Sequence, residues 1–339
     1  MGIIVKCWQY KKINMWIALA LGGYFLSAVT SIGDRFLLAS KRIIHPAGYA
    51  FLTGLLSLFA LLFAFFDVAP SLSWFARGIA ILSGVFYLYG LLFLYTAVQK
   101  QMVSLTAPLV SVASSVGIFM PVFIVSLVAG GSQSLWVWCG VFVLLLAGGS
   151  LMAFERGARD EQVIIPWRPI ILSGLFLALA QLSLKGGYTL LQVPFLSSIV
   201  WSRLGFFIGA LSLLLRPSWR QEIFETVRDL FKKNEDIAHA KSSVTSLLFV
   251  VNKILGGAAL LLIDGAIFTG SVALVQAMEG IRLAFVFLLA QVFSFMYPAV
   301  FPERFSWQEW LRKLLAFALF GVGIWLATQI ILTTLPSLA

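Results

Sequence analysis

Charged side chains are scarce in this sequence. Only 11% of the 339 residues are Asp, Glu, Lys or Arg, whereas about 25% is usual for a soluble domain. Hydrophobic residues make up 60% of the chain, against roughly 45–50% in soluble proteins. So little charge cannot cover a water-exposed surface. The composition therefore excludes a soluble globular domain and predicts an all-α integral membrane protein.

Cysteine and histidine are rarer still, with two residues of each. Cys7 and Cys139 lie far apart, which excludes a disulfide framework and a cysteine metal site. His45 and His239 lie beside predicted connections rather than inside apolar runs. We therefore expect no metal, haem or other cofactor.

The formal net charge is +10, and most of the basic residues lie in short connections between apolar runs. In that position they face anionic lipid headgroups, so the bilayer is the expected partner and nucleic acid is not.

Ten apolar runs are long enough to cross a bilayer. A hydrocarbon core of about 30 Å needs roughly 20 apolar residues in a helix. The runs lack the alternation of a β-barrel, so transmembrane helices are predicted. The first is expected to be retained, because its apolar stretch continues past any signal-peptide cleavage site. The predicted spans are 15–38, 46–66, 75–98, 103–128, 135–154, 170–192, 196–215, 244–264, 268–296 and 308–333.

Two halves of the chain resemble each other at an offset of about 150 residues. Gly23 aligns with Gly174, and the order and hydropathy of the runs agree from residues 1–154 to residues 170–335. Because each half holds five helices, an odd number, the second copy must cross the membrane upside down. The prediction is therefore ten transmembrane helices as two inverted five-helix repeats, a plan common among secondary transporters.

The polar segment 216–243 interrupts the second repeat. It is predicted to contain a helix lying flat in the membrane interface, with basic residues toward headgroups; a solvated charged loop is the alternative. Five apolar residues fall on one face at helical spacing: Ile223, Phe224, Val227, Leu230 and Phe231.

The basic residues also bear on orientation. Fifteen lysines and arginines lie in or beside the odd-numbered connections and four on the opposite side. The chain is predicted to be a multi-pass protein of the cell's inner (plasma) membrane. The positive-inside rule then places both of its termini outside the cytoplasm.

Five cations fall inside predicted spans, at a cost of about 2.5–3.5 kcal/mol each on insertion scales. Asp34 and Glu279 are the clearest acids among the spans, with Asp67 and Asp264 more marginal at span ends. Lys185, Arg203, Lys253 and Arg282 thus outnumber the two clear acids, Asp34 and Glu279, which slightly favours an anionic or zwitterionic guest. The five cations are Arg35, Lys185, Arg203, Lys253 and Arg282.

The neighbours of these charges define a candidate site between the halves. Gln276, Glu279 and Arg282 recur every third residue, and Ser111 is the repeat counterpart of Glu279. Arg282 is a candidate clamp for a carboxylate or phosphate, with Lys253 as a point charge. The predicted substrate-binding or coupling residues are Glu279, Arg282, Lys253, Lys185, Gln276, Gln181, Arg203 and Asp34.

Structural roles are an open alternative for the same charges. Glu279 and Arg282, three residues apart, would then neutralise each other, or Glu279 would pair with Lys253 as an inter-helix tie.

Two local stretches accompany this architecture: "LYTAVQKQMVSLTAPL" (94–109) and "FPERFSWQEW" (301–310). With ten helices in two copies, the chain resembles the drug/metabolite transporter superfamily, in particular its EamA-type members. Glu303 resembles the family's glutamate at the repeat end, whereas the corresponding "VAGGSQSLWVW" (128–138) has no acid. The resemblance implies alternating access and cytoplasmic termini, opposite to the charge count.

The expected function is a secondary transporter of a small organic solute, with a coupling proton or ion as a further candidate partner, acting as a monomer or homodimer. A flippase or exporter of a lipid-linked phosphate is the alternative. An intramembrane enzyme is a remote alternative, because no histidine lies at membrane depth and no catalytic motif occurs.

Overall fold

The computed structural model describes six continuous stretches and a set of shorter ones. The continuous stretches are 2–39, 45–59, 72–100, 166–231, 238–270 and 278–298, and the shorter ones are 106, 109–114, 116–117, 140, 143–144, 147–148, 151, 275, 307–308, 311–316, 318–319 and 322. The regular structure within them is helical, as the sequence predicts.

Eight helices are defined by their bounds. They are α1 (Gly2–Ala39), α2 (Pro46–Leu56), α3 (Trp74–Lys100), α6 (Trp167–Leu190), α7 (Phe195–Leu213), α8 (Pro217–Phe231), α9 (Ala238–Thr269) and α11 (Glu279–Met296).

Six of these helices contain a segment long and apolar enough to span a membrane, which supports a multi-pass membrane protein. The segments are Met15–Leu38, Trp74–Gln99, Trp167–Leu190, Phe195–Leu213, Thr245–Thr269 and Glu279–Met296, and a shorter apolar helical stretch covers Pro46–Phe59. They correspond to six of the ten predicted spans, and most of predicted spans 103–128, 135–154 and 308–333 lies outside the described residues.

One predicted boundary is wrong. The span predicted to stop at residue 264 continues as α9 to Thr269, and the span predicted from residue 268 gives its helix α11 only from Glu279. Asp264 looked like a helix end because it is charged. It is instead buried and paired with Arg203, so the helix passes through it.

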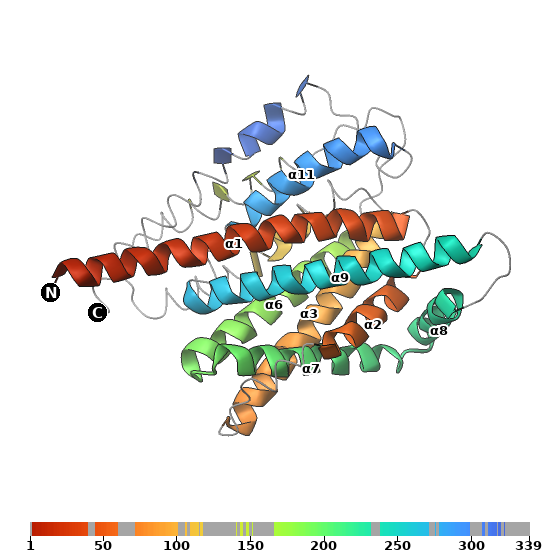
Figure 1. Ribbon diagram of the computed structural model, residues 1–339, viewed down its shortest axis with the longest axis horizontal. Helices are drawn as coiled ribbons and strands as arrows, with labels where there is room; N and C mark the ends of the chain where they lie inside the picture. The colour runs from red at the N-terminus through yellow and green to blue at the C-terminus, as the bar shows by residue number, and fades with distance from the viewer. Residues whose placement is uncertain are drawn as a thin grey trace.

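The helices pack as two groups, one of α1, α9 and α11 and the other of α2, α3, α6, α7 and α8, in which the halves of the sequence are mixed (Figure 1). Helix α1 lies along α9, with α11 on its other side. Helix α3 packs between α6 and α7, and α2 contacts α3, α7 and α8. The most extensive contacts of α1 and of α3 are therefore with helices from the other half of the chain.

Glycine makes the tightest of these contacts possible. A Cβ atom on Gly84 of α3 would overlap the carbonyl oxygen of Ser202 of α7, and one on Gly205 would overlap that of Ile81. On the other side of the molecule, a Cβ on Gly23 would overlap Ile263 of α9. Small residues let helix backbones approach in this way in a membrane.

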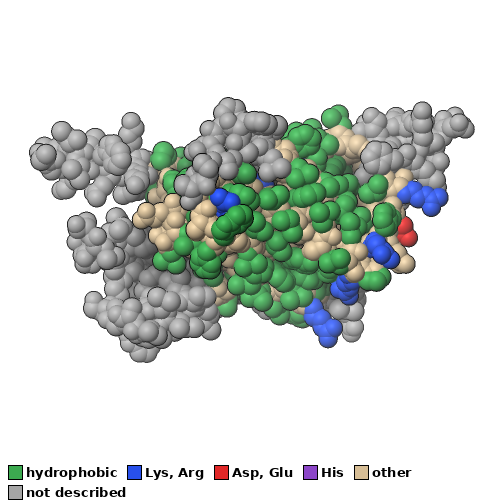
Figure 2. All heavy atoms as spheres, turned by 90° about the horizontal axis from the view of Figure 1, so that it is seen from below, with side chains coloured by type: hydrophobic (Ala, Val, Ile, Leu, Met, Phe, Trp, Pro, Cys, Tyr) green, Lys and Arg blue, Asp and Glu red, His purple; other side chains and the backbone are tan. Residues whose placement is uncertain are grey.

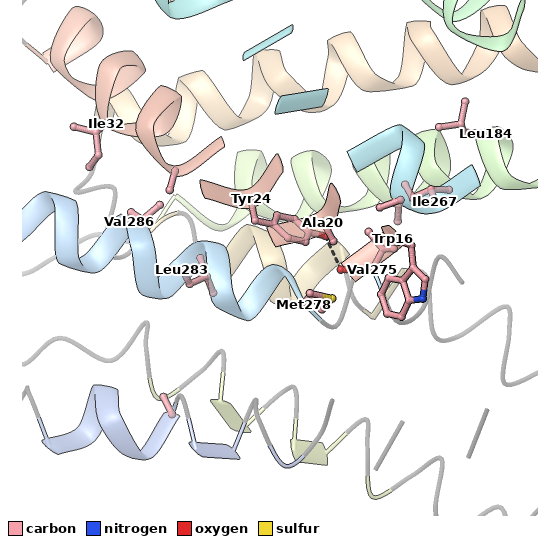
Figure 3. Close-up of a cluster of buried hydrophobic side chains, with 14 of the residues drawn as sticks. Trp16, Ala20, Tyr24, Ile32, Leu184, Ile267, Val275, Met278, Leu283 and Val286 are labelled. Carbon is pink, nitrogen blue, oxygen red and sulfur yellow. Dashed lines mark hydrogen bonds between the residues drawn. The ribbon is translucent and has the colours of Figure 1, made fainter. Parts of the chain in front are cut away.

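A buried apolar cluster joins α1 and α11 (Figure 3). Trp16, Tyr24, Met278 and Leu283 belong to it. The Tyr24 hydroxyl donates a 2.6 Å hydrogen bond to the Val275 carbonyl, just before α11 begins. The bond satisfies a backbone group that hydrocarbon would leave without a partner.

The helix predicted in the polar segment is present as α8, and it is amphipathic. Ile223 is 1% exposed, whereas its neighbour Phe224 is 61% exposed. Thr226 packs against Gly48, which fixes α8 on α2. Figure 2 shows a face that is mostly hydrophobic across its middle, with most of the visible charges toward the end where α8 lies. This pattern fits a helix at the edge of the apolar region; its place in the membrane interface remains a prediction.

Candidate functional site

The first buried charge pair joins α1 to α9. Lys253 Nζ lies 2.7 Å from Asp34 Oδ1, and the two side chains are only 9% and 16% exposed. Asp34 comes near the end of the apolar part of α1, and Lys253 about a third of the way along that of α9. The antiparallel helices place the two side chains at the same level. The attraction between the two charges then offsets part of the cost of removing both from water.

Polar and aromatic neighbours complete this pair. The Tyr49 hydroxyl and the Asn252 amide both donate hydrogen bonds to Asp34 Oδ1, and Lys253 Nζ is 3.1 Å from the Tyr95 hydroxyl. Helices α1, α2, α3 and α9 thus meet around one ammonium group.

The second pair is formed within α11. Arg282 Nη2 lies 2.5 Å from Glu279 Oε1. Ser111 donates to Glu279 Oε1 over 3.0 Å and accepts a 3.2 Å hydrogen bond from Arg282. The Arg282 Nε atom is buried and has no hydrogen-bond partner within the described part of the chain. Of the two structural alternatives, the pairing of Glu279 with Arg282 is confirmed. The other, a tie from Glu279 to Lys253, is wrong, because Lys253 lies against Asp34.

The third pair links α7 to α9. Arg203 Nη2 is 3.5 Å from Asp264 Oδ2, with side chains 12% and 7% exposed.

The three pairs lie at two levels along the helices. Lys253 and Asp264 are eleven positions apart on α9, which is about 16 Å at 1.5 Å per residue. On α1, Asp34 and Tyr24 are ten positions apart, which is about 15 Å, and the Tyr24 hydroxyl bonds to the Val275 carbonyl just before Glu279. The Asp34–Lys253 pair thus forms one layer, and the other two pairs lie further along the helices.

Lys185 plays a different part. Its Nζ donates hydrogen bonds to the carbonyls of Ile267 and Gly270, over 3.0 and 2.7 Å, at the end of α9. A cation at a helix C-terminus satisfies free carbonyls and interacts favourably with the helix dipole. The geometry supports a capping role for this predicted site residue.

We therefore expect Lys185→Ala to lower thermal stability, because two partly buried carbonyls lose a charged donor. Hydrogen bonds to charged groups contribute about 1.5–3 kcal/mol, so the melting temperature should fall by several degrees. Thermal unfolding of the purified protein measures this. An unchanged melting temperature would show that the carbonyls find other donors. Thr189→Ala, on the exposed end of α6, is a control expected to have little effect.

The two predicted glutamines differ in outcome. Gln181 of α6 has a buried Oε1 with no partner among the described residues, so it has a free acceptor one turn before Lys185. Gln276 lies outside the described residues.

The predicted charge surplus needs correction. Lys253, Arg282 and Arg203 each face a carboxylate, and Lys185 faces carbonyls. The sequence count went wrong because Asp264 was placed at a span end rather than inside α9. A preference for anions can therefore no longer rest on unpaired cations alone.

The sequence reading also passed over several residues of the site. Tyr49 and Phe249 carried no signal, because aromatic side chains are common in membrane helices. Asn252 could have been found, since it is a polar residue next to Lys253 within a membrane span. Tyr95 is only 2% exposed, so it packs inside the fold. Ser111 could be found, since the repeat alignment already pairs it with Glu279.

Among the described residues, no group of three or more His, Cys, Asp or Glu side chains could hold a metal ion. No family model matches the chain, and no curated protein matches it either.

Proposed function

We propose that the protein is a secondary transporter that moves a small organic solute, anionic or zwitterionic, by alternating access between two inverted five-helix repeats. The observation that carries the proposal is the enclosure of three charge pairs among apolar helices. One pair, Asp34–Lys253, links the halves of the chain directly, and the Glu279–Arg282 pair does so through Ser111. Ionisable groups buried in a membrane typically line solute or ion pathways.

The helix contacts support the repeat. If α1 corresponds to α6 and α3 to α9, then the packing of α3 on α6 has its counterpart in the packing of α1 on α9, and both are extensive. Ser111 and Glu279, which the repeat alignment pairs, are 3.0 Å apart. Equivalent residues touch only near a two-fold axis, so a central axis beside Glu279 fits both observations. The resemblance to EamA-type drug/metabolite transporters rests on the same plan.

The solute site is proposed at Glu279, Arg282 and Ser111. Arg282 has a buried Nε donor without a partner in the described part of the chain, and its fork suits a carboxylate or phosphate. An acidic group that draws Arg282 away leaves Glu279 uncompensated, which is costly in a low-dielectric site. A zwitterion would supply an ammonium group for Glu279, whereas an anion would need a proton on that carboxylate. The electrostatics thus favour a zwitterion, or an anion that moves with a proton.

Enclosure of the charges favours a soluble solute over a lipid-linked phosphate. The side chains of Lys253, Arg282 and Glu279 are only 9%, 12% and 13% exposed. A lipid headgroup would instead need basic groups at an apolar lateral opening.

The test begins with a ligand. Purified protein in nanodiscs is screened by thermal shift against amino acids, organic acids and sugar phosphates, and each stabilising compound is then tested for uptake into proteoliposomes. We expect at least one zwitterion or organic anion to stabilise the protein and to be transported. Stabilisation by none of these classes would contradict the proposal.

Arg282→Ala should then reduce uptake of that compound by about 10–100-fold, since a hydrogen bond to a charged group contributes about 1.5–3 kcal/mol and 1.4 kcal/mol is tenfold. Glu279→Gln/Arg282→Gln, which buries no net charge, shows whether loss of uptake reflects the site or the fold. Arg220→Ala, on the exposed face of α8, is the control for removal of an arginine. Normal uptake by Arg282→Ala would place the site elsewhere.

A further inference from the structure

The ammonium group of Lys253 is surrounded by aromatic rings. Its Nζ lies 4.2 Å from the ring centre of Tyr49, 4.9 Å from that of Tyr95 and 5.7 Å from that of Phe249. A cation within about 6 Å of a ring centre is attracted by the negative face of the ring. An ion pair with Asp34 alone would need none of these rings.

The side chains around Lys253, which form the walls of this site, also contact one another. Tyr49 and Tyr95 make an edge-to-face contact at 4.7 Å, and Tyr49 and Phe249 make another at 5.1 Å. The hydroxyl of Tyr49 also donates to Asp34. None of these contacts involves Lys253, so the walls are organised for an ammonium group independently of the side chain that now fills them.

The Asp34 carboxylate in the wall of this site needs a positively charged partner. Asp34 is held by two neutral donors, Tyr49 and Asn252, and by the Lys253 ammonium. Hydrogen bonds from neutral groups do not cancel a carboxylate charge, and a buried charge left without its partner is strongly destabilising. If Lys253 leaves, another small cation is therefore favoured in its place.

We propose that Asp34, Tyr49, Tyr95 and Phe249 form a binding site for a primary ammonium group, the ammonium cage, which Lys253 fills in this structure as a tethered occupant. The cage holds one cation at a time. Its ligand class is primary aliphatic amines, whose three N–H groups match Asp34, the Tyr95 hydroxyl and a ring face. The site is separate from the Glu279–Arg282 pair, so its existence does not depend on the proposed solute site.

A small amine can test the cage directly. Lys253→Ala removes the side chain beyond Cβ, and the missing fragment corresponds to n-propylammonium. We expect millimolar propylammonium chloride to raise the melting temperature of the full-length Lys253→Ala protein by at least roughly 2 °C. If the variant folds only when purified with the amine, that dependence is the same positive result. The wild-type protein should respond much less, because its own lysine competes at high effective concentration.

Matched controls separate the cage from general amine effects. 1-Propanol has the same chain without the charge, and sodium chloride supplies the ionic strength; neither should stabilise Lys253→Ala. The Lys253→Ala/Asp34→Asn double variant should lose the response. Lys185→Ala also lacks a buried lysine, but its site offers carbonyls without a carboxylate, and propylammonium should stabilise it less.

An equal response of Lys253→Ala to propanol, an undiminished response in the double variant, or no response at all would overturn the proposal. None of these measurements uses transport, so their failure would leave the proposed transporter function standing, and a lack of uptake would leave the cage standing.

Discussion

Asp34→Ala should destabilise the protein by about 3–5 kcal/mol, the cost of leaving one member of a buried ion pair alone. Lys253 would lose its 2.7 Å carboxylate partner while remaining 9% exposed. Tyr49 and Asn252 would lose the acceptor that they share. Because native proteins are stable by only about 5–15 kcal/mol, a large fraction of the variant should be unfolded or aggregated. The fraction recovered in nanodiscs and the melting temperature measure the effect.

The double variant Asp34→Leu/Lys253→Met tests the cause. It removes both charges and keeps their approximate volume, and such replacements are often neutral or stabilising by 1–4 kcal/mol. We expect it to recover most of the stability lost in Asp34→Ala. If it is as unstable as the single variant, packing at this position matters more than charge. Asp34→Asn, which keeps an acceptor for Tyr49, should lie between the two.

Gly84→Ala and Gly205→Ala should each separate α3 from α7. At both positions the added methyl group overlaps a backbone carbonyl of the facing helix, and a backbone cannot rotate away as a side chain can. Overpacking usually costs about 1–3 kcal/mol, and we expect values at or above the top of that range. The melting temperature of each variant in nanodiscs provides the measurement.

Gly78→Ala is the matched control on α3. Nothing lies within 4 Å of a Cβ atom there, and alanine favours a helix over glycine by about 1 kcal/mol. This variant should therefore be as stable as the original chain or slightly more so. Equal effects of Gly78→Ala and Gly84→Ala would mean that close approach of the two helices is not what these glycines provide.

The spans were readable from the sequence because their cause is local. Hydrocarbon requires long apolar helices, and five of the six spans observed among the described residues begin and end near predicted bounds, the exception being the start of α11. The amphipathic α8 was readable for the same reason, since its apolar side repeats at helical spacing. The error at Asp264 arose because a charge is a local signal for a helix end unless a distant partner neutralises it.

Partners across helices could not be read in the same way. Asp34 and Lys253 are 219 positions apart in the chain, and nothing in either neighbourhood marks the other. Glu279 and Arg282 were found because one helical turn joins them. Tyr49 and Phe249 were missed because aromatic residues serve lipid contact and packing throughout a membrane protein, and only the fold reveals which of them surround a cation.

The mixing of the two halves has a consequence for how the protein is made. Helix α3 is synthesised well before α6 and α7, yet these two provide its most extensive contacts. The same holds for α1, which packs on α9. Helices α1 and α3 therefore enter the bilayer before their main partners have been synthesised. During that interval Asp34 has no Lys253 to pair with. Until α9 emerges, the nascent chain therefore carries a carboxylate without its cationic partner, which makes this interval a vulnerable stage of biogenesis.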